Sequence, residues 1–437
     1  MEWWMVFAII MGLLFLLYST GMPVAFCFLI LNIIGVIVFM GGEAGLNQFI
    51  LTLRGSVASF VMLPLVFFTL MGEFLVQTGI AMNLIDTLDK WLGRLPGRLG
   101  LISVASGVIL AALSGSSLAS TAILGKSLTP EMEKRGYKRP MSLGPVMAAG
   151  NLAVLIPPSS VAVLLAALAE TSIADVLIGG TMPGLMMAAA YCIYIIVRCW
   201  LQPSIAPSYE VAPTPLAEKL VLTLKYVVPF GFVIFMVTGI IFLGVATPSE
   251  AAATGTVGSI VLAACYGRIN KRVLIDVFRN SLRISAMIMF LITGAIGFGQ
   301  ILGFSGASAG LTEYVLGLPI PPVLIIVVLN IVLVVVGMFT SAMAVILVVV
   351  PLFKPLITAL GMSPVWFCLL MLVNSEIAAI SPPYGLVLFT MKAVAPKGTT
   401  MSEIYQAAYP FFIMNLVILG VMIAFPKAML WLPSLTH

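Results

Sequence analysis

Two proline pairs interrupt apolar stretches of this chain, and hydroxyl-bearing residues accompany both. Residues 150–164 read GNLAVLIPPSSVAVL and residues 375–389 read SEIAAISPPYGLVLF. Adjacent prolines remove backbone donors and clash with the preceding turn, so a helix cannot continue through them. In a bilayer, a broken helix is tolerated only where protein or a water-filled cavity surrounds it. The sequence therefore predicts two helices that are interrupted at membrane depth.

Two further polar breaks lie at residues 114–117 (SGSS) and 337–341 (GMFTS). Each break frees backbone carbonyls and offers hydroxyls, which are oxygen ligands for Na⁺, whereas the N-termini of half-helices favour an anion. We expect one ion site per half of the chain, with 114–117 facing 150–157 and 337–341 facing 374–382. The alternative is helix packing, because small residues also line close helix contacts.

Acidic residues are rare in the apolar segments, and Glu73 and Glu376 are the main ones. Charge at membrane depth is costly and usually functional. Glu376 lies six residues before Pro382. It fits a proton site, a cation ligand or the partner of a buried lysine, and both Lys354 and Lys392 remain open as partners. Glu73 either serves the site or reaches an interface.

Composition identifies a membrane protein. Of 437 residues, 61% are hydrophobic and 8% are charged, against roughly 25% charged in soluble domains. Several apolar runs reach the roughly 20 residues needed to span a bilayer. Five scattered cysteines show no metal-ligand spacing and the only histidine is His437. We therefore expect no catalytic residue, no transition metal, no nucleic-acid partner and no enzyme, an intramembrane enzyme being the remote alternative.

An internal repeat becomes visible when residue i is laid over residue i+225. Pro157-Pro158 falls on Pro382-Pro383, Gly72 on Gly297 and Ser116 on Ser341. Repeats with broken helices at matching places are typical of secondary transporters. We predict an all-α polytopic membrane protein, an inverted-repeat elevator-type transporter with two re-entrant helical hairpins and discontinuous helices. The expected parts are scaffold spans (1–59), a first repeat in the transport domain (60–200), a linker (201–225), further scaffold spans with a surface amphipathic helix (226–286) and a second repeat in the transport domain (287–437).

The number of spans sets the predicted topology. If 60–92 and 287–318 are re-entrant hairpins, five spans precede the linker, so the second half enters the membrane inverted. One side then holds six of the 21 cations, and the other holds the rest, including those of loop 129–140. The positive-inside bias places the richer side in the cytoplasm. Both termini are then expected in the periplasm. The six cations are Arg54, Lys90, Arg94, Arg98, Lys354 and Lys427.

Four segments carry a family resemblance: LSGSSLASTAILGKSLTPEMEKRGYKRPMSLGPVMAAGNLAVLIPPSSVAVL, ATPSEAAA, GMFTSAMAVILVVVPLFKPL and SPPYGLVLFTMKAVAP. In this order they resemble the large membrane (permease) subunit of tripartite ATP-independent periplasmic (TRAP) transporters. The resemblance implies a Na⁺-coupled elevator importer of organic acids in a bacterial inner membrane. It also implies two partners, a periplasmic substrate-binding protein and a small membrane subunit of about four spans, each long enough to cross a bilayer.

The resemblance also assigns ion ligands. It implies a first Na⁺ site at Ser114, Ser116, Ser117, Gly150, Ala153 and Pro157, and a second at Gly337, Thr340, Ser381 and Pro382. Many family members carry Asp after Gly-Met-Phe and Asn-x-x-Ile-Gly before the second proline pair, and this chain departs from both patterns. The substrate is expected between the breaks, near Ser117, Asn151, Ser159, Ser341, Asn374 and Glu376.

The expected function is Na⁺-coupled, binding-protein-dependent import of a small carboxylate. Two alternatives stay open: a stand-alone Na⁺- or H⁺-coupled dicarboxylate or oxyanion carrier of the same architecture, and the intramembrane enzyme. Uptake by this chain alone would support the stand-alone carrier. Catalytic side chains that meet at one place inside the membrane would support the enzyme.

Overall fold

The computed structural model describes residues 2–91, 95, 97–207 and 215–435, without side chains at positions 81 and 112–114. The described chain is helical and contains no strand. Seven of its helices are long and apolar enough to cross a membrane. The first half comprises α1 (Trp3–Ser19), α2 (Val24–Phe39), α3 (Glu43–Val57), η1 (Phe60–Met62), α4 (Leu63–Gln77), α5 (Ile80–Trp91), α6 (Arg98–Ser114), α7 (Ser117–Lys134), α8 (Arg139–Asn151), η2 (Leu152–Val154), α9 (Ser160–Leu168), α10 (Ile173–Leu201) and η3 (Pro203–Ile205).

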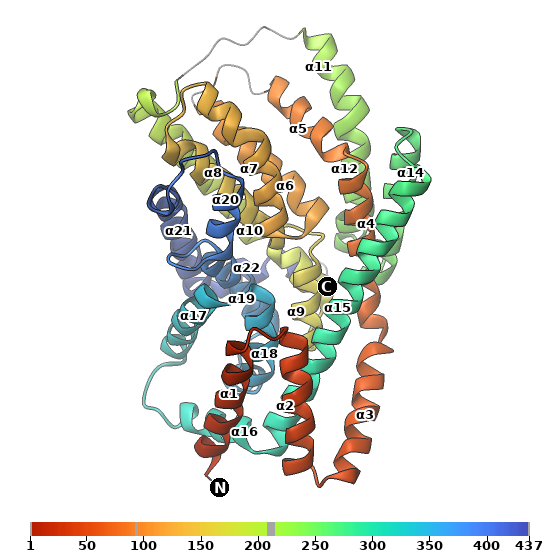
Figure 1. Ribbon diagram of the computed structural model, residues 1–437, viewed down its shortest axis with the longest axis vertical. Coiled ribbons are helices and arrows are strands. Elements are labelled where there is room, and N and C mark those ends of the chain that lie inside the picture. Colours follow the sequence, from red (N-terminus) through yellow and green to blue (C-terminus); the bar gives the residue numbers. More distant parts are fainter. Residues whose placement is uncertain (1, 92–94, 96, 208–214, 436–437) are drawn as a thin grey trace.

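The described part of the second half begins with α11, at the upper end of Figure 1. The predicted linker 201–225 lies partly outside the described residues, and a helix already starts at residue 216. The elements are α11 (Leu216–Leu222), η4 (Thr223–Val227), α12 (Val228–Ile234), η5 (Phe235–Gly239), α13 (Ile240–Phe242), α14 (Pro248–Cys265), α15 (Lys271–Phe304), α16 (Ala307–Leu316), α17 (Pro322–Phe339), α18 (Ala342–Ala359), α19 (Pro364–Ala379), α20 (Leu386–Val394), α21 (Met401–Ala424), α22 (Pro426–Leu430) and η6 (Pro433–Leu435).

The structure confirms the internal repeat. Helices α7 and α18 both have 18 residues and begin at 117 and 342, which are 225 residues apart. When a helix of one half packs on a helix of the other half, the counterparts of these two helices in the repeat also pack on each other. Helix α2 packs on α15, and their counterparts α14 and α4 pack on each other; likewise α8 packs on α21, and α19 on α10. Such exchange is what a two-fold relation produces, because a contact from i to j then implies a contact from j to i.

The two re-entrant hairpins were predicted in the wrong places. Helix α15 runs unbroken for 34 residues through Gly297, so residues 287–318 form no hairpin turn there. Residues Phe60–Gln77 are long and apolar enough to cross a membrane by themselves, and α5 follows as a separate helix. The sharp reversals lie instead at Gly115-Ser116, where α6 meets α7, and at Thr340-Ser341, where α17 meets α18. The predicted single span at 99–128 is therefore a pair of helices.

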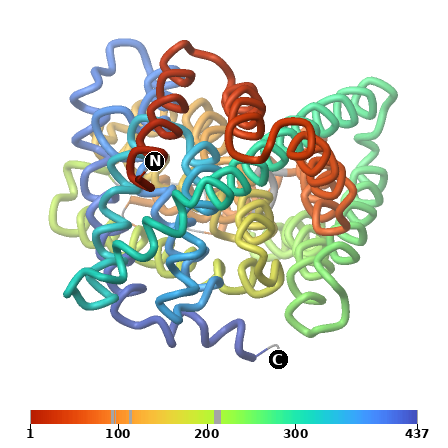
Figure 2. The backbone as a smooth tube through the Cα atoms, turned by 90° about the horizontal axis from the view of Figure 1, so that it is seen from below, coloured from red at the N-terminus to blue at the C-terminus, as the bar shows by residue number. Residues whose placement is uncertain are grey.

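Glycines of α15 serve close packing inside a continuous helix, where the sequence suggested a break. A Cβ at Gly294 would lie 2.8 Å from Phe28 Cβ, and a Cβ at Gly297 would lie 2.5 Å from Phe49 Cε2. These glycines let α2 and α3 approach α15 closely rather than interrupting it. Figure 2 shows α15 running alongside the N-terminal helices.

Both proline breaks were predicted correctly. Helix α8 ends in η2 before Pro157-Pro158, and α9 starts only at Ser160; α19 ends before Pro382-Pro383, and α20 starts at Leu386. Both Pro-Pro peptide bonds are cis. In Figure 1 the α6–α7 hairpin lies in the upper half and α17–α18 in the lower half, so the two hairpin turns approach the middle of the molecule from opposite ends.

Candidate functional site

Four helices begin at the breaks, and a serine caps three of them, namely α7, α9 and α18. Ser116 Oγ accepts from Ala119 N at 3.4 Å at the start of α7, and Ser159 Oγ accepts from Ala162 N at 3.2 Å at the start of α9. Ser341 Oγ does the same for Ala344 N at 3.3 Å in α18. A helix N-terminus carries a partial positive charge and unpaired N–H groups, so it favours an anion.

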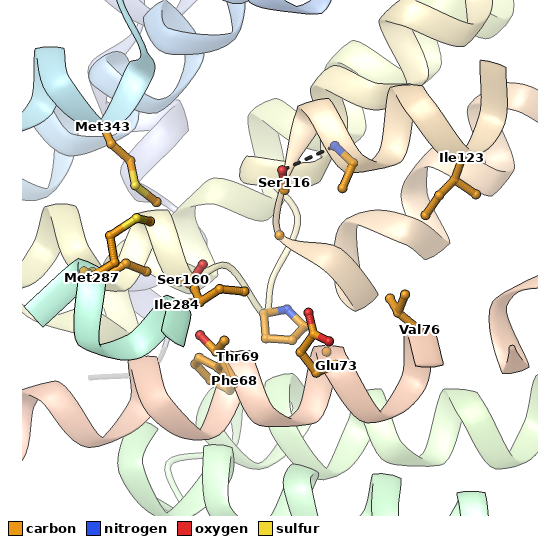
Figure 3. Close-up of a pocket in the computed structure, with 15 residues that line it drawn as sticks. Phe68, Thr69, Glu73, Val76, Ser116, Ile123, Ser160, Ile284, Met287 and Met343 are labelled. Carbon is orange, nitrogen blue, oxygen red and sulfur yellow. Dashed lines mark hydrogen bonds between the residues drawn. The ribbon is translucent and has the colours of Figure 1, made fainter. Parts of the chain in front are cut away.

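A cavity of about 330 Å³ lies where the first two of these N-termini meet the surrounding helices. Gly115, Ser116 and Ser160 line one wall, and Thr69 and Glu73 of α4 line another; in Figure 3 the α4 side chains point toward the two serines. The remaining lining is mostly apolar: Phe68, Gly72, Val76, Ala119, Ile123, Pro158, Ile284, Met287, Ile288 and Met343. An apolar pocket with a few convergent polar groups is the usual form of a small-molecule site.

The first pair of breaks makes an unusually close backbone approach. A Cβ added to Gly150 would lie 1.9 Å from Thr121 Oγ1 and 3.0 Å from the Ser117 carbonyl oxygen. Thr121 is fully buried, and its hydroxyl has no hydrogen-bond partner among the described residues. A buried hydroxyl and a backbone carbonyl oxygen beside a glycine are oxygen donors of the kind that a hard cation such as Na⁺ prefers.

A buried polar cluster joins the two halves beside this break. Ser117 Oγ donates to the Glu376 carboxylate, at 3.0 Å from Oε1 and 2.8 Å from Oε2, and Glu376 is 1% exposed. Asn151 Nδ2 donates to the Glu376 backbone carbonyl at 2.7 Å. Asn151 and Glu376 are 225 residues apart, so they are repeat equivalents that touch each other. A residue meets its own equivalent only at the two-fold axis, and the cluster therefore lies on it.

Neither lysine considered for Glu376 is its partner. Lys354 Nζ forms an ion pair with Glu170 Oε2 at 2.6 Å, and Lys392 Nζ donates to the Thr399 carbonyl. Within the described residues the Glu376 side chain contacts only the Ser117 hydroxyl by hydrogen bonding.

The second pair of breaks leaves only a very small cavity. A Cβ at Gly337 would lie 2.6 Å from Ala378 Cβ, and a cavity of about 10 Å³ remains between Gly337, Asn374, Ser375 and their neighbours. That volume is at the lower limit for one water molecule. Ser381 Oγ is buried without a hydrogen-bond partner in the described chain.

The predicted site residues fall into separate places. Ser117, Gly150, Asn151 and Glu376 come together, with Ala153 and Pro157 following in the same buried break. Thr340 lines a different, apolar cavity of about 780 Å³ beside α1, and Asn374 donates to Asn330 of α17 at 2.9 Å. The side chain of Ser114 lies outside the described residues.

Sequence reasoning missed four of the polar residues described above: Thr69, Thr121, Ser160 and Asn330. Thr121 follows Ser117 by one helical turn, and that spacing is a signal that could have found it, because residues i and i+4 share a helix face. Glu73 was noted as an acid in an apolar run and lies in the cavity wall.

The family model of the tripartite ATP-independent periplasmic transporter, DctM component, matches residues 11–428. The chain belongs to this family. It is similar to the C4-dicarboxylate TRAP transporter large permease protein DctM of Pseudomonas aeruginosa, with 33% identity covering 86% of each chain. It is also similar to the isethionate TRAP transporter permease protein DctMQ of Oleidesulfovibrio alaskensis, with 29% identity covering 83% of this chain and 56% of that protein.

The fold of this TRAP large permease is shared with a solved transporter. The crystal structure of the Alcanivorax borkumensis YdaH transporter superposes with a TM-score of 0.67 at 17% identity, covering 89% of this chain and 90% of that one. The chain is thus a polytopic membrane transporter subunit, and its family consists of transport proteins rather than enzymes.

Proposed function

We propose that this chain imports a small organic anion across the bacterial inner membrane, coupled to Na⁺ and dependent on a periplasmic binding protein and a small membrane subunit. The observation that carries the Na⁺ part is the unpartnered Thr121 hydroxyl facing Gly150 beside the Ser117 carbonyl. The capped N-termini of α7 and α9 at the 330 Å³ cavity carry the anion part.

The geometry suggests how the two events are linked. Ser116 and Ser117 begin α7, so the same turn that faces the cavity also contributes a carbonyl to the Gly150 break. Ordering this turn around Na⁺ presents the N-terminus of α7 to the anion. For a net positive stoichiometry, the membrane potential adds about 2.3 kcal/mol per charge per 100 mV.

We propose an elevator movement for the crossing itself. Helices α6–α10 and α17–α21 contain both hairpins and both proline breaks, and α2–α4, α14 and α15 pack against one another beside them. The cavity lies between these two groups, because α7 and α9 line one wall and α4 and α15 line the other. If α6–α10 and α17–α21 moved as a rigid body against α2–α4, α14 and α15, they would carry the cavity wall formed by Gly115, Ser116 and Ser160 with them.

The relocated hairpin also sharpens the proposed orientation. Because α6 and α7 form a hairpin, Lys90 and Arg98 lie on the same side as the basic loop around Lys134. This concentrates cations further on the side that the positive-inside bias assigns to the cytoplasm, with both termini in the periplasm. Lys134→Cys, in a background without the exposed Cys265, should react with an impermeant thiol reagent only after permeabilisation. Thr358→Cys should react in intact cells; the reverse pattern would refute the orientation.

The functional test is uptake in proteoliposomes that hold this chain and its small subunit, with the binding protein outside. We expect uptake to need both an inward Na⁺ gradient and the binding protein. Thr121→Val should raise the Na⁺ concentration for half-maximal uptake, whereas Thr121→Ser should keep it near that of the wild type. Full uptake without Na⁺ would reject Na⁺ coupling, and uptake without the binding protein would establish a stand-alone carrier.

A further inference from the structure

The 330 Å³ cavity has two chemically different polar ends. At one end, α7 and α9 present their N-terminal turns through Gly115, Ser116 and Ser160. At the other end, the Glu73 carboxylate of α4 lines the wall next to Thr69. Figure 3 shows the Glu73 side chain directed across the cavity toward Ser116. The body between the two ends is apolar.

The charge of Glu73 is not neutralised by a neighbouring cation. No lysine or arginine lines the cavity in the described part of the chain, and Glu73 takes part in no ion pair there. Its Oε2 accepts from Asn280 Nδ2 at 3.2 Å and from Gln77 Nε2 at 3.4 Å. Both donors hold Oε2, and no hydrogen bond among the described residues reaches Oε1.

Like charges repel more strongly beside protein than in bulk water, because the effective dielectric constant there is lower, and Glu73 is half-buried in the cavity wall. An anion with a second carboxylate would place that group against Glu73 once its first carboxylate lies at the helix N-termini. A hydrogen-bond donor without negative charge would instead complete the coordination of Glu73.

We propose that this cavity selects a short carboxylate whose far end is a hydrogen-bond donor without negative charge, and that Glu73 excludes dicarboxylates. The inference rests on the proposed function, because it takes the cavity as the site of an organic anion. It separates this chain from its C4-dicarboxylate relative in substrate class. The donor is an ammonium or a hydroxyl group, and the experiment distinguishes the two.

The test uses four probes with the same four-carbon backbone: 4-aminobutyrate, 4-hydroxybutyrate, butyrate and succinate. Each is titrated into the purified full-length chain, complexed with its small subunit and in saturating Na⁺, and binding is measured by the shift in thermal unfolding and by calorimetry. We expect 4-aminobutyrate or 4-hydroxybutyrate to bind at least tenfold more tightly than succinate, a difference of about 1.4 kcal/mol. The tighter of the two identifies the donor.

Glu73→Gln should weaken 4-aminobutyrate binding tenfold or more and strengthen succinate binding. Glu73→Asp keeps the charge and should keep the preference, which guards against a variant that fails to fold. Glu313→Gln, which removes an exposed acid outside the cavity, should change neither probe.

The outcomes separate the inference from the function on which it rests. Tighter binding of succinate than of the two donor probes, or an unchanged ranking in Glu73→Gln, would overturn the role of Glu73 and leave the transport proposal standing. Failure of all four probes to bind wild-type protein would instead count against a carboxylate site in this cavity, and so against the proposed function.

Discussion

Gly150→Ala tests the closest approach in the candidate ion site. The new Cβ would lie 1.9 Å from Thr121 Oγ1, about 1.5 Å short of ordinary contact between such atoms. The Ser117 carbonyl oxygen, on the same face of α7, lies 3.0 Å from the new Cβ and cannot rotate away. Either the Thr121 side chain or the whole of α7 must move. Overpacking a core in this way costs about 1–3 kcal/mol, and we expect the upper part of that range because backbone is involved.

The assay is thermal unfolding of the purified protein with and without Na⁺. A cation that binds only the folded state at 100 times its dissociation constant adds about 2.7 kcal/mol, so wild type should melt higher in Na⁺ than in choline. Gly150→Ala should melt lower and lose this Na⁺ response. Combining it with Thr121→Ala should restore much of the stability, because the nearest atom is removed, but not the Na⁺ response. Gly420→Ala, where a Cβ meets nothing within 4 Å, is the matched control. A variant at position 150 that melts like wild type and still responds to Na⁺ would refute the reasoning.

Three further variants test other contacts by thermal unfolding. Gly107→Ala places a Cβ 2.4 Å from the Ala149 carbonyl oxygen, and should cost about 3 kcal/mol because a backbone atom cannot rotate away. Tyr191→Phe removes the 2.6 Å hydrogen bond to Asn415 Oδ1, and should cost about 1–3 kcal/mol because that buried amide oxygen loses its donor. No loss of stability would contradict a contribution of this buried hydrogen bond. Lys354→Gln breaks only a partly exposed ion pair, and should change stability by less than about 1 kcal/mol, whereas a large loss would show that Lys354 supports a buried charge.

Much of the architecture followed from one regularity in the sequence. The offset of 225 residues aligned the two proline pairs, and it also aligns α7 with α18 and α2 with α14 in the structure. Two adjacent prolines remove successive backbone donors and end the helix, whereas single prolines such as Pro183 and Pro410 lie inside the continuous helices α10 and α21. The breaks at Pro157 and Pro382 could therefore be placed from sequence alone.

The hairpins could not be placed in this way, because glycine has two opposite uses. In α15, Gly294 and Gly297 sit under Phe28 and Phe49 and hold a straight helix against its neighbours. At the tip between α6 and α7, Gly115 adopts a φ of 55°, which turns the chain. Only the partner that packs on a glycine distinguishes these uses, and that partner is far away in sequence.

The candidate site was recovered in part for a related reason. Ser117 and Glu376 were recognised because each is polar in an apolar run, yet their contact with each other depends on how the halves dock. Thr121 was missed because a threonine in a helix ordinarily bonds to its own backbone. Here the Thr121 hydroxyl has no such bond among the described residues. Its position beside Gly150 depends on how α7 and α8 pack, which the sequence does not show.

The two-fold relation also explains why the halves differ at their central position. Asn151 and Glu376 occupy equivalent places, and their contact at 2.7 Å puts them on the axis. A Glu at position 151 would place its carboxylate against the Glu376 backbone carbonyl, so two buried acceptors would meet without a donor between them. An Asn opposite a Glu removes one charge and supplies a donor to the carbonyl of the other half. The two repeats are therefore least able to carry the same residue at the position where they contact each other. The difference between Asn151 and Glu376 follows from the two-fold relation that brings these residues together.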